Sequence, residues 1–193
     1  MGNNSVRQEK LVLASKSPRR AEILRAVGWP FEAVTTGIDE TRQPSEDATT
    51  YITRLAREKA QAVAKDLSSG LVLGADTVVV IDSEILGQPR DQDDARRMLR
   101  LLSGKWHDVM TAVALVRAGR GDVVTDHELT RVRFSEMADE EIDWYAASDE
   151  PKDKAGAYAV QGKAALFIEE IQGEYFNIMG LPIRLVYELT QRI

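Results

Sequence analysis

The apolar run LVLGADTVVVID, residues 71–82, limits the possible folds more than any other segment. Valine and isoleucine dominate it, which predicts a strand buried at the centre of a sheet. An aspartate inside such a strand is disfavoured unless its carboxylate is paired or coordinates something. Asp76 is therefore a candidate functional carboxylate, and Gly74 on the same face would leave room beside it. A bulge or the end of the strand at Asp76 would be the structural alternative.

Strand-like and helical patterns alternate along the rest of the chain, and no internal repeat or linker divides it. Gly119 and Gly121 separate two long strand-like stretches, which predicts a hairpin. We expect an α/β (α+β) fold in which helices flank a mixed twisted sheet, with a flexible N-terminal segment (1–10) followed by one domain (11–193). The predicted strands span 11–15, 31–36, 71–82, 106–119 and 122–134, with another at the end of 154–173, and the predicted helices span 17–28, 45–67, 91–104, 138–148 and 181–193.

The composition excludes several classes of function. With 31 acidic and 25 basic residues the formal charge is −6, so the chain lacks the basic character that nucleic acid or an anionic membrane attracts. It has no cysteine, and its two histidines lie twenty residues apart, so neither a disulfide nor a zinc-type spacing is present. No apolar run approaches about 18 residues, and the N-terminus lacks the apolar core of a signal peptide. We expect a cytoplasmic protein with no nucleic-acid or membrane partner.

The sequence SPRR predicts the start of a helix at Ser17 but places Arg19 and Arg20 in its first turn. The helix macrodipole disfavours cations there, each at roughly 0.3–1 kcal/mol when exposed. An anion bound at the helix start would reverse the sign, and the hydroxyls of Ser15 and Ser17 would add donors. Alternatively, the two arginines lie in solvent and pair with Glu22 or another acid.

Two further positions break the local pattern. Lys59 falls inside the apolar stripe of the predicted helix 45–67. Its amine either reaches back into water or is delivered into a cleft at the edge of the core. In the segment DKAGAYAVQG (153–162), small residues would let a ligand approach the backbone, and the amide of Gln161 would suit the edge of a base. A plain turn before a strand explains the glycines equally well.

Together these segments resemble the Maf family of cytoplasmic nucleoside triphosphate pyrophosphatases. The resemblance covers nearly the whole chain, and GADT and AGAYAVQG are similar to the branch whose members act on dTTP and UTP. It implies two lobes around a central nucleotide-binding cleft, a Maf/ITPase-like fold, and a homodimer. The segments that carry it are LASKSPRRAEIL, TGIDETRQP, RLAREKA, GADTVVV, LSGKWHDVMTAVAL, SDEPKDKAGAYAVQG and GLPI.

The resemblance also implies a role for each candidate residue. Asp76 would be the general base that accepts a proton from water, and Glu40 and Asp76 would bind a divalent metal cation, Mg²⁺ or Mn²⁺. The implied reaction hydrolyses dTTP, UTP or modified pyrimidine nucleotides between the α and β phosphates, releasing a monophosphate and pyrophosphate. The implied substrate-binding residues are Ser15, Ser17, Arg19, Arg20, Lys59, Thr77 and Gln161.

One position departs from the family pattern. Gln88 precedes Pro89, where family members usually have a lysine. If that lysine holds phosphate, turnover here would be slower, or a neighbour such as Arg90 would compensate. The departure favours an alternative function, a nucleotide-binding regulator of cell division that does not hydrolyse its ligand. Asp76 and Glu40 argue against that alternative, because a pure sensor needs no carboxylate that activates water.

Overall fold

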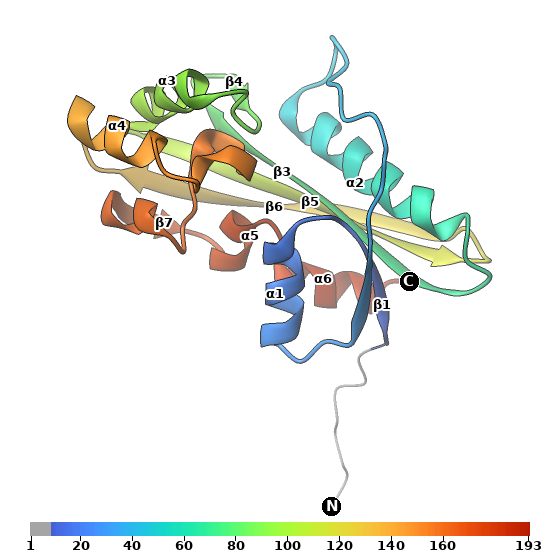
Figure 1. The fold of residues 1–193 in the computed structure, drawn as a ribbon. Helices are drawn as coiled ribbons and strands as arrows, with labels where there is room; N and C mark the ends of the chain where they lie inside the picture. Colours follow the sequence, from blue (N-terminus) through green and yellow to red (C-terminus); the bar gives the residue numbers. More distant parts are fainter. Residues whose placement is uncertain (1–8) are drawn as a thin grey trace, which may run out of the picture.

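The computed structural model describes residues 9–193 and shows a mixed sheet with helices on both of its faces (Figure 1). The division of the chain at residue 10 stays a prediction, and residues 1–8 lie outside the described part. The strands are β1 (Leu11–Ala14), β2 (Phe31–Val34), β3 (Gly70–Ile81), β4 (Glu84–Leu86), β5 (Trp106–Ala118), β6 (Val123–Phe134) and β7 (Ile168–Gln172). The α-helices are α1 (Pro18–Ala26), α2 (Ala48–Ala64), α3 (Gln92–Leu102), α4 (Asp139–Ala146), α5 (Tyr175–Met179) and α6 (Ile183–Thr190), and the 3-10 helices are η1 (Pro151–Asp153), η2 (Ala155–Ala157) and η3 (Lys163–Leu166).

The sheet confirms the predicted mixed α/β class. Its strand order is β2-β1-β3-β5-β6-β7, with β4 paired to β3 outside this path. Strand β1 runs parallel to both β2 and β3, and the remaining pairs are antiparallel. The predicted hairpin is formed by β5 and β6, and Gly119 and Gly121 in its turn have φ values of 78° and 79°. These positive φ angles explain why the turn carries glycine.

Strand β3 lies at the centre of the sheet, as its apolar sequence predicts. Its antiparallel register with β5 runs from Gly70 opposite Ala118 to Val80 opposite Asp108 without a shift. Asp76 pairs with Ala112 in the middle of this register, so the alternative of a bulge or strand end at Asp76 is wrong. Its place in the strand therefore has to be explained by its surroundings.

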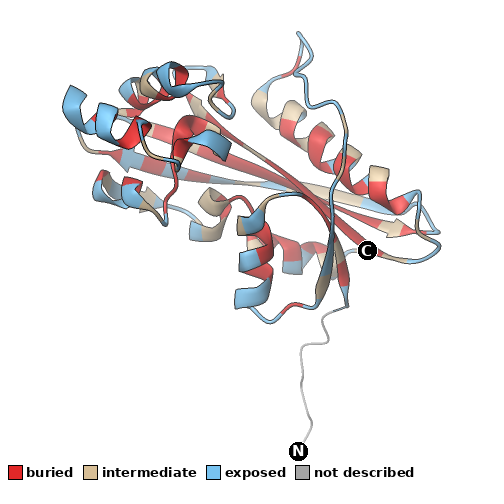
Figure 2. Cartoon of the chain, viewed as in Figure 1, coloured by how far each residue is buried: buried red, intermediate tan, exposed pale blue. Residues whose placement is uncertain are grey.

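Buried side chains cover both faces of β3, and Figure 2 shows the buried residues following the central strands. Helix α2 packs on one face, while α1 and α6 pack on the other. Helices α3 and α4 cover the far end of the long strands. Because both faces are buried, β3 reads as a continuous apolar run rather than as an alternating one. Among residues 9–193, no helix combines the length and the hydropathy that a membrane crossing needs.

Gly74 determines how closely α2 approaches β3. A Cβ atom at this position would lie 2.1 Å from the carbonyl oxygen of Ala56 and 2.8 Å from the amide nitrogen of Ala60. The room that Gly74 was expected to leave beside Asp76 is therefore filled by the backbone of α2. This close contact carries Lys59, on the same helix, to the face of β3 that holds Asp76.

Three elements differ from the sequence-based prediction. Strand β4 was not expected, because the tight turn before it uses Asp82 and Ser83 at φ values of 49° and 68° instead of glycine. Helix α5 was also missed, since five residues are too few for a helical period. The stretch 154–173 forms η2 and η3 before a strand of only five residues, β7.

Candidate active site

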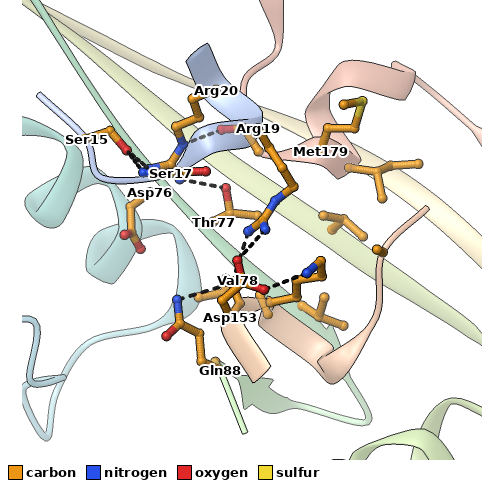
Figure 3. A pocket seen from close by; sticks show the side chains of 18 of the residues that line it. Ser15, Ser17, Arg19, Arg20, Asp76, Thr77, Val78, Gln88, Asp153 and Met179 are labelled. Carbon is orange, nitrogen blue, oxygen red and sulfur yellow. Dashed lines mark hydrogen bonds and ion pairs between the residues drawn. The ribbon is translucent and has the colours of Figure 1, made fainter. Parts of the chain in front are cut away.

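A cavity of about 390 Å³ brings the candidate residues together (Figure 3). They come from five places: the β1–α1 turn, the loop after β2, helix α2, strand β3 and the segment after η2. These five places lie far apart in the sequence, and the fold brings them together. The cavity is lined by every residue that the resemblance implies for catalysis, substrate binding or metal binding, namely Ser15, Ser17, Arg19, Arg20, Glu40, Lys59, Asp76, Thr77 and Gln161.

Lys59 binds both candidate carboxylates. Its Nζ lies 2.6 Å from Oδ1 of Asp76 and 3.2 Å from Oε1 of Glu40. Lys59 and Asp76 are both buried. The Lys59 amine therefore does not reach back into bulk water, which was one of the two alternatives that the sequence left open. Burying an ion pair is costly unless the geometry is good, and this pair has a short, direct hydrogen bond.

The environment of Asp76 favours proton uptake. Burial raises the pKa of the Asp76 carboxyl above its usual value, and the attraction of Lys59 and Arg20 opposes this shift without cancelling it. Repulsion from Glu40 acts in the same direction as burial. Within residues 9–193 the hydrogen bond to Asp76 engages Oδ1, which leaves Oδ2 for a ligand or water in the cavity. A carboxyl whose pKa is raised in this way takes up a proton more readily than a free aspartate does.

The two adjacent arginines have different surroundings. Arg20 is buried, and burial lowers its pKa while the nearby Asp76 counteracts the shift. Its Nε donates to the carbonyl of Gly180 at 2.7 Å, Nη1 donates to Oγ of Ser15 at 3.1 Å, and Nη2 donates to Oγ1 of Thr77 at 3.2 Å. A guanidinium has five N–H donors, so these bonds leave two for a ligand. Arg20 thus braces the wall of the cavity from inside.

Arg19 lies at the edge of the cavity and points toward Asp153 (Figure 3). Its Nη1 donates to Oδ2 of Asp153 at 2.7 Å, and its Nη2 donates to the carbonyl of the same residue at 3.0 Å. The acid that pairs with Arg19 therefore comes from η1, far along the chain, and not from Glu22. Sequence reasoning missed Asp153, because only the tertiary fold brings it to Arg19.

The start of α1 supplies polar groups as the sequence predicted. Ser17 is the N-cap residue and Pro18 takes the first helical position, but the Ser17 hydroxyl makes no capping hydrogen bond. The backbone N–H of Ser17 donates instead to Oγ of Ser15, at 3.1 Å. The Ser17 side chain thus lines the cavity without a bond to its own helix.

Thr77 and Gln161 lie in different parts of the lining. The Thr77 Oγ1 is 2.9 Å from Oγ1 of Thr111 and accepts from Arg20, so its hydroxyl is tied into the sheet. Gln161 is exposed on the cavity wall. The sequence analysis missed Tyr51, which lines the cavity and donates from its hydroxyl to the carbonyl of Glu40 at 2.8 Å. That bond ties the Glu40 loop to α2.

The glycines of segment 153–162 have packing roles. Gly156 has φ 67°, and a Cβ there would lie 2.8 Å from Cγ2 of Val79. A Cβ at Gly162 would lie 2.3 Å from a carboxylate oxygen of Glu150. Close packing therefore explains these glycines, while neighbouring residues of the same segment, Tyr158 among them, line the cavity.

Gln88 lines the cavity, and its Nε2 donates to the carbonyl of Asp153 at 3.4 Å. Arg90 does not join it: its side chain is 82% exposed and pairs with Asp94 at 3.2 Å. The suggested compensation by Arg90 is therefore wrong. A different cation, Lys154, lines the same cavity.

Glu40 and Asp76 are the residues whose oxygens would hold a metal. Within residues 9–193 there is no group of three or more histidine, cysteine, aspartate or glutamate side chains that would enclose an ion. Mg²⁺ is commonly bound by one or two carboxylates together with substrate phosphates and water. Two carboxylates that converge on one ammonium group fit a cation whose remaining ligands come from a bound nucleotide.

Comparison with known proteins gives three findings. The family model described as Maf-like protein matches residues 10–193. A dTTP/UTP pyrophosphatase of Bacillus cereus is 49% identical over 94% of this chain and 95% of its own length, and one of Bacillus anthracis is 48% identical with the same shares. The Ham1 protein structure from Staphylococcus aureus has 10% identity and a TM-score of 0.50, covering 95% of this chain and 99% of that one, which shows a likeness of fold alone.

Proposed function

The chain belongs to the Maf-like protein family, and from this premise we propose that it is a nucleoside triphosphate pyrophosphatase that hydrolyses dTTP and UTP. Relatives at about half identity over nearly the full length carry that activity in their names. The observation that carries the proposal for this chain is the single cavity that joins a buried proton acceptor, Asp76, to the arginine pair Arg19 and Arg20. One group would act on water and the others on phosphate.

The reaction breaks the bond between the α-phosphorus and the oxygen that bridges to the β-phosphorus. A water oxygen attacks the α-phosphorus, and the bridging oxygen leaves with pyrophosphate. Asp76 accepts the proton of the attacking water, for which its raised pKa suits it. Lys59 holds the Asp76 carboxylate through Oδ1, so that Oδ2 is the oxygen left to face a ligand in the cavity.

The β1–α1 turn binds the phosphates. Arg20 contributes its two remaining N–H donors from a rigid position, while Ser15 and Ser17 add hydroxyl groups. Arg19 approaches from the edge of the cavity. Fixed cations and N–H groups at a helix start stabilise the charge that develops on the leaving pyrophosphate. The proposal accounts for the placement of two arginines in the first turn of α1.

Glu40 and Asp76 would hold Mg²⁺ or Mn²⁺. When bound, such a cation polarises a phosphoryl oxygen and neutralises part of its charge. Lys59 draws the two carboxylates toward one another, and Tyr51 fixes the backbone of Glu40, so that both oxygens face the same region of the cavity. The chain therefore supplies two oxygen ligands and leaves the others to the nucleotide.

Gln161 would select the pyrimidine. Its amide both donates and accepts, which matches the O4 acceptor and the N3–H donor of thymine and uracil. Thr77 would act indirectly, because its hydroxyl already binds Arg20 and Thr111. We also propose that the protein is cytoplasmic and forms a homodimer, as the resemblance to the Maf family implies.

The direct test incubates the full chain with each common and several modified nucleoside triphosphates, with Mg²⁺ or Mn²⁺, and measures released pyrophosphate. Release from dTTP and UTP but not from purine nucleotides is the expected result. Binding of dTTP without release from any nucleotide would overturn the proposal and favour the non-hydrolysing regulator.

A further inference from the structure

A carboxylate occupies the mouth of the proposed phosphate site. Oδ2 of Asp153 is 2.7 Å from Nη1 of Arg19, and its Oδ1 is 2.5 Å from Nζ of Lys154 (Figure 3 shows the side chain of Asp153 reaching Arg19). Each carboxylate oxygen therefore takes one cation. Two oxygens of one phosphate group would engage the same pair of cations in the same way.

The three side chains differ in exposure. The side chains of Arg19 and Lys154 are 18% and 14% exposed, whereas that of Asp153 is 51% exposed. The cations are thus built into the cavity wall, while the anion between them borders solvent. Asp153 has room to rotate outward, and the cations do not have comparable freedom to follow it.

The backbone of Asp153 is held separately from its carboxylate. Its carbonyl accepts from Nη2 of Arg19 at 3.0 Å and from Nε2 of Gln88 at 3.4 Å. The carboxylate can therefore leave both cations while η1 stays in place against the cavity. Burial works against ionisation of Asp153, but hydrogen bonds from Lys154 and Arg19 hold its pKa below the ordinary value. The side chain is accordingly an anion at neutral pH.

We propose, on the basis of the function proposed above, that Asp153 is an internal competitor for phosphate. Arg19 and Lys154 form a phosphate subsite, and the terminal phosphates of the nucleotide fill it by displacing the Asp153 carboxylate. After the reaction Asp153 returns to the two cations and promotes release of pyrophosphate. Lys154 thereby becomes a phosphate-binding residue.

A purely structural role for Asp153 makes the opposite prediction. If Asp153 serves only to hold Arg19 toward the substrate, its loss should weaken phosphate binding. If Asp153 competes with phosphate, its loss should strengthen binding, and loss of Lys154 should weaken it. The direction of the change therefore separates the two roles.

The experiment measures the affinity of the full chain for inorganic pyrophosphate by titration calorimetry, in EDTA and at fixed ionic strength, because exposed ion pairs are screened by salt. Asp153→Asn and Lys154→Met are compared with the unchanged chain. Asp149→Asn is the matched control: Asp149 lies in the same segment, is 95% exposed and pairs with Lys152, away from the cavity.

We expect Asp153→Asn to bind pyrophosphate about 2- to 30-fold more tightly, which is the effect of removing two partially exposed ion pairs. Lys154→Met should bind more weakly, and Asp149→Asn should match the unchanged chain. The KM for dTTP should fall in Asp153→Asn. Asp153→Ser, with a thermal melt, repeats the test if the asparagine variant is unstable.

Three results would overturn the inference: unchanged or weaker binding by Asp153→Asn, an equal gain in Asp149→Asn, or no pyrophosphate binding by any form. Hydrolysis of dTTP by the unchanged chain is measured separately and decides the proposed function. If the chain hydrolyses dTTP but fails the pyrophosphate comparison, the proposed function stands and the inference that Asp153 competes with phosphate is wrong.

Discussion

Lys59 and Asp76 form a buried ion pair in which Nζ and Oδ1 are 2.6 Å apart. The pair connects a close helix–strand contact to the chemistry of the site, because Lys59 belongs to α2 and Asp76 to β3. Gly74 permits the contact, and Glu40 completes the cluster from a loop. A change at any of these positions should therefore alter activity, stability or both.

Asp76→Asn should lower kcat by about 10²–10⁴-fold, the usual effect of removing a general base. An amide has the shape of the carboxylate but accepts a proton far less readily. Nucleotide binding should stay close to that of the unchanged chain, since the substitution leaves the proposed phosphate site, α1 and its preceding turn, intact. Steady-state kinetics with dTTP and a separate binding titration provide the two numbers. Unaltered kcat would remove Asp76 from the role of base.

The central strand and the order of the long elements were predictable from sequence. The β-branched side chains of β3 predict a strand, and the N-cap residue Ser17 with the proline after it predicts the start of α1. The anomalies at Asp76 and Lys59 were also visible, because each breaks a local apolar pattern. Local sequence patterns are informative wherever the burial of a position within one helix or strand determines which residue type it carries.

What escaped prediction depends on contacts between distant segments. Asp153 faces Arg19 across 134 positions of sequence, and no local pattern marks such a pair. The different surroundings of Arg19 and Arg20 are set by the fold, which buries Arg20 against Gly180 and leaves Arg19 at the rim. Gly74 was noticed but misinterpreted, since sequence alone does not reveal that a helix backbone fills the space beside it.

Gly74→Ala should destabilise the fold and disturb the site together. The added Cβ would lie 2.1 Å from the carbonyl oxygen of Ala56, so α2 has to move away from β3. Overpacking of this kind typically costs about 1–3 kcal/mol. Denaturant unfolding measures the loss, and kcat for dTTP reports the displaced Lys59. Gly37→Ala is the control, because a Cβ there meets nothing within 4 Å. Equal stability of the two variants would contradict the packing role of Gly74.

Glu46 should make the fold sensitive to acid. Hydrogen bonds from Arg54 lower the pKa of Glu46 to about 2, an effect that outweighs its burial, and the N–H of Gln43 adds to it. Because the carboxylate is held more tightly ionised in the folded protein, its stabilisation is present above pH 4.5 and is lost as the pH falls toward 2. The free energy of unfolding of Glu46→Gln should therefore differ most from the unchanged chain near neutral pH.

The measurement for Glu46 is a series of denaturant unfolding curves between pH 2 and pH 7. The gap between the unchanged chain and Glu46→Gln should close as the pH falls. Glu140→Gln, on the exposed side of α4, controls for the loss of one negative charge. A gap that stays constant with pH would show that Glu46 acts through packing and not through its charge.

Arg19→Ala should mainly raise the KM for dTTP. Arg19 lies at the rim of the cavity, and in the proposed function it binds the part of the nucleotide that leaves as pyrophosphate, so its loss should weaken binding while the proposed base, Asp76, is unchanged. Initial rates over a range of dTTP concentrations separate KM from kcat. An unaltered KM would return Arg19 to the role of a surface residue paired with Asp153.

Arg20→Lys should reduce stability, whereas Arg19→Lys should not. Both substitutions keep the positive charge and remove the guanidinium fork. At Arg20 the fork joins the carbonyl of Gly180 to the hydroxyls of Ser15 and Thr77 in a buried place, so a lysine leaves acceptors unpaired at about 1–3 kcal/mol. At Arg19 the lost bonds go to a half-exposed residue, where an ion pair contributes about 0.2–1 kcal/mol. Unfolding curves of the two variants give the comparison directly, and equal losses would mean that Arg20 is not the internal brace of the cavity.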